Sequence, residues 1–465
     1  MKIIVNKFGG GILKKELIPF IEQRLKEEIA SGYSPFVIVS ALPGTTDELI
    51  HILTELKKKK NYEKTIRPIL NKIKEKHNQT LMDLDLAENY RLKATKLLIQ
   101  NFTELENKLK NLKNTEIQNK TEDMVIAYGE RLSSYLFSVY LENLNLESEV
   151  FLAEDLKILT DENFKNANIL YKTSEKNVQK KLKNINLIPI IPGFTGITKN
   201  GDTTTLGRGG TDTTACFIGA AIRAEKIILW KDVGGVLSAD PRIVKQARTI
   251  PSVSYQEAEE AGKIIHDKAI QYAKMWNTPI EITSLAKPNQ KTIVGKPNTN
   301  KKTKMQTKII GYKKNLVLFI VTDEYKKEND MLSITSNAFF KNKVDIILIS
   351  NTKYSLQIVA DNANGKADTV YEEIAKKVSK VETFPVSMIY LVGNFDVKDV
   401  NEFNNFLTKI KVDMEISAFL YKDCTRLEAI IKTKSQEELE KIIKSLHKKF
   451  IPVYPAKRDK AGRAK

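Results

Sequence analysis

The chain has 465 residues, of which 42% are hydrophobic and 28% are charged, and its formal net charge is +18. This length suffices for two or three domains, and the hydrophobic fraction excludes a wholly disordered chain. No stretch approaches the roughly 20 consecutive apolar residues of a membrane-spanning helix, and the N-terminus lacks a signal-peptide core. With only two cysteines and four histidines, we expect a cytoplasmic protein with no membrane partner, no disulfide framework and no metal cluster.

The excess of positive charge does not predict a nucleic-acid partner. Lysines are concentrated at 56–60, 287–308 and 457–465, and elsewhere they stand beside acidic residues. Mixed charges of this kind are typical of solvated helix faces. The basic runs contain no aromatic residues at a spacing that would stack bases, so we expect no nucleic-acid binding.

The first 40 residues predict a βαβ unit. Residues 2–7 form a strand-like run, three glycines follow at 9–11, and residues 14–31 carry apolar side chains at helical spacing. The continuous apolar run at 35–40 is typical of a buried parallel strand. This order predicts a doubly wound α/β domain with a mainly parallel sheet.

A helical excursion and a second α/β stretch follow. Residues 47–120 are polar with helical periodicity, which predicts helices outside the sheet. Beyond them we expect strands at 185–191, 226–230 and 279–283, and a helix of small residues at 213–224. These elements continue the same α/β domain.

The last third of the chain changes character. Residues 286–308 contain seven lysines and no acidic residue, and we interpret them as a linker. Beyond it, the strand-like runs 315–321 and 355–361 are similar to the runs 387–393 and 426–432. Each copy predicts the order β-α-β-β-α, which is typical of tandem ferredoxin-like α+β modules.

A glycine turn provides the first chemical signal. In Lys7-Phe8-Gly9-Gly10-Gly11, the glycines let backbone N–H groups turn toward an anion, and the following helix adds its positive end. Lys7 adds an ammonium group where phosphate oxygens would lie. The alternative is an ordinary strand-to-helix turn with an exposed lysine.

Two later segments carry further charged residues. In the Gly- and Thr-rich run 207–215, Arg208 can hold a carboxylate through two parallel hydrogen bonds, and Asp212 either binds a ligand or caps a helix. Lys231, Asp232 and Arg242 follow the strand expected at 226–230. Ligands in open α/β sheets bind beyond the carboxyl ends of strands, so these charges predict a polyphosphate site.

Five motifs stand along the chain in a characteristic order. They are Lys7-Phe8-Gly9-Gly10, Val39-Ser40-Ala41 with Gly44-Thr45-Thr46-Asp47, Gly129-Glu130-Arg131-Leu132-Ser133, the run from Gly207 to Asp212, and Asp240-Pro241-Arg242. In this order they resemble the aspartate kinases of the amino-acid kinase superfamily, and the C-terminal repeat resembles the paired ACT regulatory domains of that family. The resemblance implies a kinase domain at 1–295 and ACT modules at 309–382 and 383–455.

The resemblance implies transfer of the γ-phosphoryl group from MgATP to the β-carboxylate of L-aspartate. The product would be 4-phospho-L-aspartate, at the head of lysine, threonine and methionine biosynthesis. A carboxylate with a pKa of about 3.9 is already ionised at neutral pH and needs no general base, which agrees with the absence of a His or Cys dyad. The reaction needs positive charge and positioning instead.

The resemblance also implies a role for each motif. Lys7 bridges the transferred phosphoryl group, and Asp212 organises that lysine and the substrate amine. Arg208 and Glu130 hold the α-carboxylate and the α-ammonium of the substrate, and Ser40 and Thr46 supply hydroxyl contacts. The expected nucleotide-binding residues are Lys7, Gly9, Gly10, Lys231, Asp232, Arg242 and Lys263.

Some positions depart from the family pattern. Gly11-Ile12 stand where the family has Thr-Ser, Lys231 replaces a threonine, Leu237 replaces a tyrosine, and the helix before Lys263 is about one turn shorter than usual. Two alternatives therefore stay open. One is a kinase of the same superfamily acting on another acid or phosphate acceptor, and the other is a non-catalytic paralogue that serves as a ligand-binding or regulatory subunit.

The ACT-like modules imply a homodimer or higher homo-oligomer and an amino-acid effector. The segment 324–331 lacks the glycines of the family's first ACT loop, and 350–354 has no counterpart of its Ser-Ser-Glu segment. Glycine is what lets a backbone approach a bound amino acid closely. Inhibition by lysine or threonine is therefore left open, and the modules can serve mainly as a dimer interface.

Overall fold

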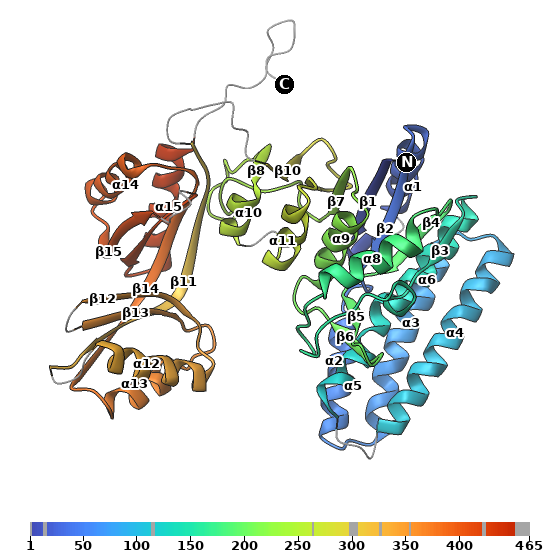
Figure 1. Cartoon of the computed structure of the whole chain (residues 1–465), viewed down its shortest axis with the longest axis horizontal. Helices are drawn as coiled ribbons and strands as arrows, with labels where there is room; N and C mark the ends of the chain where they lie inside the picture. The colour runs from blue at the N-terminus through green and yellow to red at the C-terminus, as the bar shows by residue number, and fades with distance from the viewer. Residues whose placement is uncertain are drawn as a thin grey trace, which may run out of the picture. The chain divides into compact units, whose positions relative to one another are not determined.

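Figure 1 shows the computed structural model of the chain, which describes residues 2–12, 16–112, 117–262, 265–296, 306–324, 328–352, 355–420 and 425–451. The chain forms two compact units. One comprises Met1–Val236 and Thr249–Asn298, and the other comprises Leu237–Arg248 and Thr299–Lys465. Within the described ranges, no helix is both long enough and apolar enough to cross a membrane.

The first unit is built on an eight-stranded sheet with the order β3-β4-β2-β1-β7-β9-β10-β8. Neighbouring strands are parallel except β9 and β10, which are antiparallel. The inner strands are continuous apolar runs with mostly buried side chains, as expected of a covered parallel sheet. The predicted mainly parallel α/β fold is confirmed. The strands are β1 (Lys2–Phe8), β2 (Tyr33–Val39), β3 (Ser148–Val150), β4 (Ile188–Pro192), β7 (Lys226–Trp230), β8 (Ser252–Ser254), β9 (Ile280–Thr283) and β10 (Lys291–Gly295), with β5 (Thr195–Ile197) and β6 (Thr203–Thr205) forming a separate hairpin.

Helices connect these strands and differ in detail from the prediction. The helix expected at 14–31 is described from Ile18, with Pro19 in its first turn, and it ends before Gly32, whose φ is 78°. The helix expected at 213–224 begins earlier, at Gly210, because Gly209 at its N-cap has a φ of 72°. The helices are α1 (Ile18–Ala30), α2 (Thr45–Lys57), α3 (Arg67–Asp83), α4 (Glu88–Asn111), α5 (Asn119–Ile126), α6 (Tyr128–Asn143), α7 (Ala153–Leu156), α8 (Tyr171–Leu182), α9 (Gly210–Ala221), α10 (Tyr255–Ala261) and α11 (Asp267–Met275), with short turns η1 (Gly10–Ile12) and η2 (Tyr62–Ile66).

The prediction of a linker over 286–308 is wrong at β10. This strand pairs with β9 and β8 and therefore belongs to the first unit's sheet. Thr292 and Val294 are fully buried, whereas Lys291 is exposed, so the strand alternates between the two faces. The lysine-rich composition of the whole segment concealed a short β-branched run with high strand propensity.

The second unit contains a six-stranded antiparallel sheet with the order β12-β13-β11-β14-β16-β15. The predicted order β-α-β-β-α occurs twice along the chain and is confirmed. The first copy consists of β11 (Gln306–Thr322), α12 (Glu328–Asn342), β12 (Ile346–Thr352), β13 (Ser355–Asp361) and α13 (Ala367–Ala375). The second consists of β14 (Lys380–Asn394), α14 (Val397–Lys409), β15 (Asp413–Leu420), β16 (Arg426–Lys432) and α15 (Gln436–Phe450).

The two copies share their long strands. β11 pairs with β14 along most of its length, and a register shift between Lys313 and Leu316 divides it into two halves. The first half pairs with the part of β14 that also pairs with β16, whereas the second half pairs with β13 as well. Each copy thus completes its sheet with a strand from the other, and a boundary between residues 382 and 383 falls inside β14.

Leu237–Arg248 belongs to the second unit although it interrupts the sequence of the first. The backbone N–H of Ile310 donates to the carbonyl oxygen of Ser238 at 2.8 Å, and the Oγ of Ser238 lies 2.9 Å from Nε2 of His447. The segment's apolar side chains, including Ile243, pack into the hydrophobic core of the second copy, which also contains Phe403. The segment is therefore fixed by both hydrogen bonds and buried apolar contact.

Candidate active site

Glycine and charged residues gather where neighbouring strands of the first sheet end. β1, β7 and β9 run parallel and end at Phe8, Trp230 and Thr283, so the residues that follow them share one edge of the sheet. Gly10 approaches the turn after β2 so closely that a Cβ built on it would lie 2.0 Å from the carbonyl oxygen of Ala41. Only glycine fits this position, so the glycine turn and the turn after β2 are packed together.

Two lysines share one buried carboxylate at this edge. Nζ of Lys7, in β1, lies 3.1 Å from Oδ1 of Asp212, and Nζ of Lys231, directly after β7, lies 2.8 Å from Oδ2. Asp212 is the third residue of α9 and is 7% exposed. Burial tends to raise the pKa of Asp212, but the two lysine charges outweigh it, and the pKa lies below its ordinary value. The cluster therefore carries a net positive charge.

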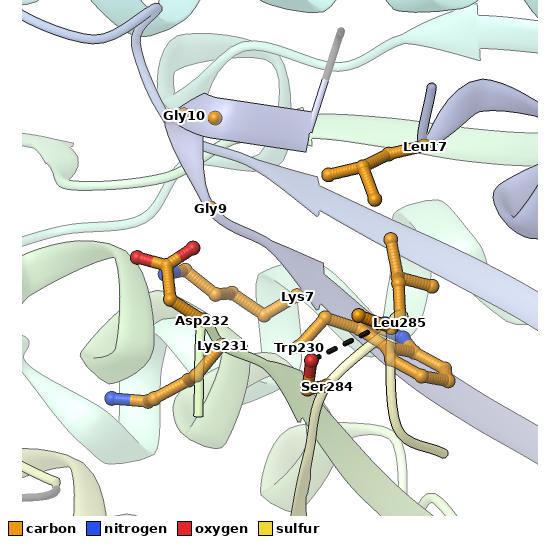
Figure 2. Close-up of a pocket in the computed structure, with 11 residues that line it drawn as sticks. Lys7, Gly9, Gly10, Leu17, Trp230, Lys231, Asp232, Ser284 and Leu285 are labelled. Atoms are coloured by element: carbon orange, nitrogen blue, oxygen red, sulfur yellow. Dashed lines mark hydrogen bonds between the residues drawn. The ribbon is translucent and has the colours of Figure 1, made fainter. Parts of the chain in front are cut away.

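A cavity of about 340 Å³ adjoins this cluster. Figure 2 shows that it has a charged end and an apolar end. Its lining comprises Lys7, Gly9, Gly10, Gly11, Lys231 and Asp232, the apolar residues Leu17, Trp230 and Leu285, and also Ser284 and Ala286. Lysines and a glycine turn suit a polyphosphate, while the apolar end suits an aromatic base.

Glu130 places a second buried carboxylate in the same unit. It lies in the first turn of α6 and is 5% exposed. The backbone N–H of Ala41 and its own N–H donate to the carboxylate, yet its Oε2 has no hydrogen-bond partner in the part of the chain that is described. Burial raises the pKa of Glu130 to about 7, against the opposing effects of these hydrogen bonds and of the Lys7 charge. A buried carboxyl group with one unpaired oxygen is suited to pair with a cationic group of a ligand.

Ser40 and Thr46 lie on the segment that joins β2 to α2. The carbonyl oxygen of Ser40 accepts a hydrogen bond of 2.7 Å from Oγ of Ser133, in α6, and its N–H donates to the carbonyl oxygen of Phe8. Thr46 stands in the first turn of α2, which follows Gly44 with a φ of 75°. The segment with both hydroxyls is thus fixed between β1 and the helix that carries Glu130.

Three further residues were predicted for the site, and neither of the two that the structure describes lines the cavity. Arg208 is exposed on a turn between Gly207 and Gly209, both with positive φ, and within the described ranges it forms no hydrogen bond or ion pair. Arg242 belongs to the second unit, where it is 84% exposed in its side chain and pairs with Asp240 at 2.7 Å. Lys263 lies outside the described residues.

Sequence reasoning missed a series of buried hydrogen bonds that supports β1 next to Lys7. Nε1–H of Trp230 donates to Oδ1 of Asn6 at 2.9 Å, and Nδ2 of Asn6 donates to Oε2 of Glu28 at 2.7 Å. Asn6 precedes Lys7 and is fully buried. The signal was available in the sequence, because an asparagine inside an apolar strand requires hydrogen-bond partners.

The acidic side chains at the cavity could bind a magnesium ion only together with the phosphate oxygens of a nucleotide. Among the described residues, no group of three or more His, Cys, Asp or Glu could hold a metal ion. Asp212 is engaged by two lysines, which leaves the exposed carboxylate of Asp232 at the cavity. Mg²⁺ typically keeps several waters and takes one or two carboxylates in addition to phosphate oxygens, so this donor set suits it.

Comparison with known proteins shows which family and which proteins this chain is similar to. Residues 2–284 match the amino acid kinase family. The chain is 28% identical to the aspartokinase of Rickettsia felis over 316 residues, which cover 67% of this chain and 64% of that protein. It is 26% identical over 479 residues to "Aspartokinase 1, chloroplastic" of Arabidopsis thaliana, with coverage of 96% and 80%.

Solved structures resemble the fold over nearly the whole chain. Aspartokinase III of E. coli, in complex with lysine and aspartate, has a TM-score of 0.77 at 20% identity. The aspartate kinase of Clostridium acetobutylicum has a TM-score of 0.77 at 23% identity. Each alignment covers 97% of this chain and 100% of the other. At these identities the likeness establishes the fold.

Proposed function

Because the chain belongs to the amino acid kinase family, we propose that it is an aspartate kinase, which transfers the γ-phosphoryl group of ATP to the β-carboxylate of L-aspartate. The observation that carries the proposal is the pair of lysines on Asp212 beside the glycine turn. The buried carboxyl of Glu130 adds a group suited to an amino acid as the acceptor.

Phosphoryl transfer demands positive charge rather than a base. Charge spreads over the oxygens of the transferred group in the transition state, and prearranged cations and N–H groups stabilise it. Lys7 and Lys231 supply two ammonium groups, and the glycine turn supplies backbone N–H groups. Asp212 fixes the directions of both lysines, so their positions do not have to be organised during the reaction.

An L-aspartate acceptor accounts for the remaining charged residues. Its α-ammonium would pair with Glu130, and its α-carboxylate would accept two hydrogen bonds from Arg208. The β-carboxylate is then left to attack the γ-phosphorus, and since it is already ionised it needs no proton acceptor. The hydroxyl groups of Ser40 and Thr46 would complete the contacts to the acceptor.

The cavity would hold the nucleotide with its phosphates at the charged end. Leu17, Trp230 and Leu285 would contact the adenine at the apolar end. A magnesium ion bound to the phosphates, with Asp232 nearby, would neutralise further negative charge.

A hydroxamate trap for acyl phosphate tests the proposal. The protein is incubated with MgATP, hydroxylamine and one of L-aspartate, L-glutamate or N-acetylglutamate. Hydroxamate formed with aspartate alone supports the proposal, whereas hydroxamate formed with another acid contradicts the assigned acceptor. No product with any acid, together with intact nucleotide binding, would support the non-catalytic alternative.

Variants on one strand link the activity to the site. We expect Lys7→Ala to lower kcat by two or more orders of magnitude, as is typical for loss of an electrostatic group that acts in the transition state. The matched control is Lys2→Ala, an exposed lysine of the same strand β1. Equal activity in the two variants would refute the role of Lys7.

A further inference from the structure

A buried carboxylate outside the cavity ties together the two segments that carry Glu130 and Arg208. Asp123 lies in α5 and is fully buried. Its Oδ2 accepts hydrogen bonds of 2.8 Å from the backbone N–H groups of Lys165 and Thr205. Its Oδ1 accepts a hydrogen bond of 2.9 Å from Oγ1 of Thr205. The carboxylate therefore joins α5 to the loop at Lys165 and to the end of β6.

The helix end of this connection leads to Glu130. α5 ends at Ile126 and α6 begins at Tyr128, and the intervening Ala127 donates its N–H to the carbonyl oxygen of Asp123 at 3.0 Å. The chain thus remains helical from the carboxylate to Glu130. A displacement of Asp123 would be transmitted along this helical segment rather than absorbed by a loop.

The loop end leads to Arg208. Thr205 ends β6, and its carbonyl oxygen accepts a hydrogen bond of 2.9 Å from the N–H of Ala167. At Gly207, with a φ of 75°, a Cβ would lie 2.6 Å from Oδ1 of Asn166, so the two loops are in direct contact next to Arg208. Arg208 itself is exposed, so its direction depends on the anchoring of this turn.

Neighbouring contacts hold the same loops. The side chain of Lys165 pairs with Glu122, the residue before Asp123, at 3.0 Å. Nζ of Lys268 donates to Oδ1 of Asn166 at 2.6 Å. The backbone and the side chain of Lys165 are therefore both held by α5, while α11 holds the next residue.

We propose that Asp123 is a positioning residue that sets the separation of Glu130 and Arg208 and thereby the affinity for the amino-acid acceptor. The proposal rests on the proposed function for the identity of that acceptor. Asp123 does not line the cavity, so it acts through the loop and the helix and not through the nucleotide. Removing it leaves the backbone N–H groups of Lys165 and Thr205 without their acceptor, and since Thr205 is buried, the loop must move to satisfy its N–H group.

Three substitutions separate positioning from general stability. Asp123→Ala removes all three hydrogen bonds. Asp123→Asn is the conservative variant, because its amide oxygen can accept from both backbone N–H groups while its NH₂ donates to the Thr205 hydroxyl. Asp396→Ala is the matched control, since Asp396 also accepts from two backbone N–H groups, those of Lys398 and Asp399, but lies in the second unit.

Steady-state kinetics provide the first readout. We expect Asp123→Ala to raise KM for aspartate by about tenfold or more, with KM for ATP within about twofold, because the acceptor groups and not the cavity are displaced. Asp123→Asn and Asp396→Ala should stay close to the wild type. An unchanged KM for aspartate, or a parallel loss of both substrates' affinities and of kcat, overturns the proposal.

Hydrogen exchange provides a readout that needs no activity. Peptides covering 163–168 and 203–210 should exchange faster in Asp123→Ala than in the wild type, at a temperature at which both proteins are folded. If that variant fails to fold, Thr205→Val removes only the hydroxyl bond and should produce a smaller change in the same peptides. Unchanged exchange in the folded variants overturns the proposal. Absence of hydroxamate from the wild type refutes the proposed function instead, and the two failures are thereby distinguished.

Discussion

The buried carboxyl of Glu130 makes a quantitative prediction about pH. Its pKa rises from the ordinary 4.5 to about 7 on folding, chiefly because the side chain is buried. The folded state therefore holds this proton more tightly than the unfolded state does, and the free energy of unfolding falls as pH rises from 4.5 through 7. At about 1.4 kcal/mol for each tenfold change in an acidity constant, ionised Glu130 costs the folded state about 3 kcal/mol.

Glu130→Gln isolates this contribution. The amide oxygen can accept from the same backbone N–H groups as the carboxyl, and the side chain resembles the protonated acid. Near pH 5 the two proteins should have similar stability. By about pH 8 the variant should be the more stable by about 2 to 3 kcal/mol, because only the wild type has ionised.

Tryptophan fluorescence is suited to this measurement. Both tryptophans of the chain, Trp230 and Trp276, lie in the first unit, so their emission follows the unfolding of the unit that contains Glu130. Urea unfolding of wild type and variant is followed at several pH values, with Glu149→Gln, an exposed glutamate on β3, as control. An identical pH dependence in wild type and Glu130→Gln would refute the reasoning.

Three further predictions concern other parts of the chain. Lys231→Met should raise KM for ATP about tenfold through loss of a charged hydrogen-bond donor to phosphate, measured by steady-state kinetics, and an unchanged KM would remove Lys231 from the nucleotide site. Gly10→Ala places a Cβ 2.0 Å from the carbonyl oxygen of Ala41 and should lower nucleotide affinity in calorimetry, whereas normal affinity would show that the turn adjusts freely. Phe403→Ala removes a fully buried ring that contacts Phe450 and should destabilise the second unit by about 3 to 5 kcal/mol. It should also expose Leu237–Arg248 to trypsin, and wild-type resistance to cleavage would contradict the anchoring seen here.

The sequence predicted those parts of the fold whose signal lies within one continuous stretch of residues. The strand, the glycine turn and the helix at the N-terminus are encoded in one continuous stretch, and the repeat of β-α-β-β-α follows from similar runs in both copies. β10 was missed because its three β-branched residues lie within a lysine-rich segment, and strand formation there depends on pairing with β9. The exchange of strands between the two copies depends on the register shift at Lys313, which no periodicity reveals.

The site was predictable to the extent that its residues belong to motifs. The resemblance predicted that Lys7 and Asp212 lie together, and the structure places them 3.1 Å apart. Lys231 was expected near the nucleotide, but that it shares Asp212 with Lys7 depends on the adjacency of β1 and β7, which are more than 200 residues apart in sequence. Asp123 carries no motif, and its importance appears only when its three hydrogen-bond donors are seen.

The proposed function explains why a carboxyl group that destabilises the folded protein stands at this position. In the free protein burial favours the protonated form of Glu130, while Asp212 stays ionised between its two lysines. An incoming ammonium group favours the ionised form of Glu130, because its positive charge offsets the cost of burying the carboxylate. Rising pH therefore acts in opposite directions: it lowers the stability of the free protein and raises its affinity for an acceptor with an α-ammonium group. A purely structural buried carboxyl would show only the first of these effects, since nothing would bind its ionised form.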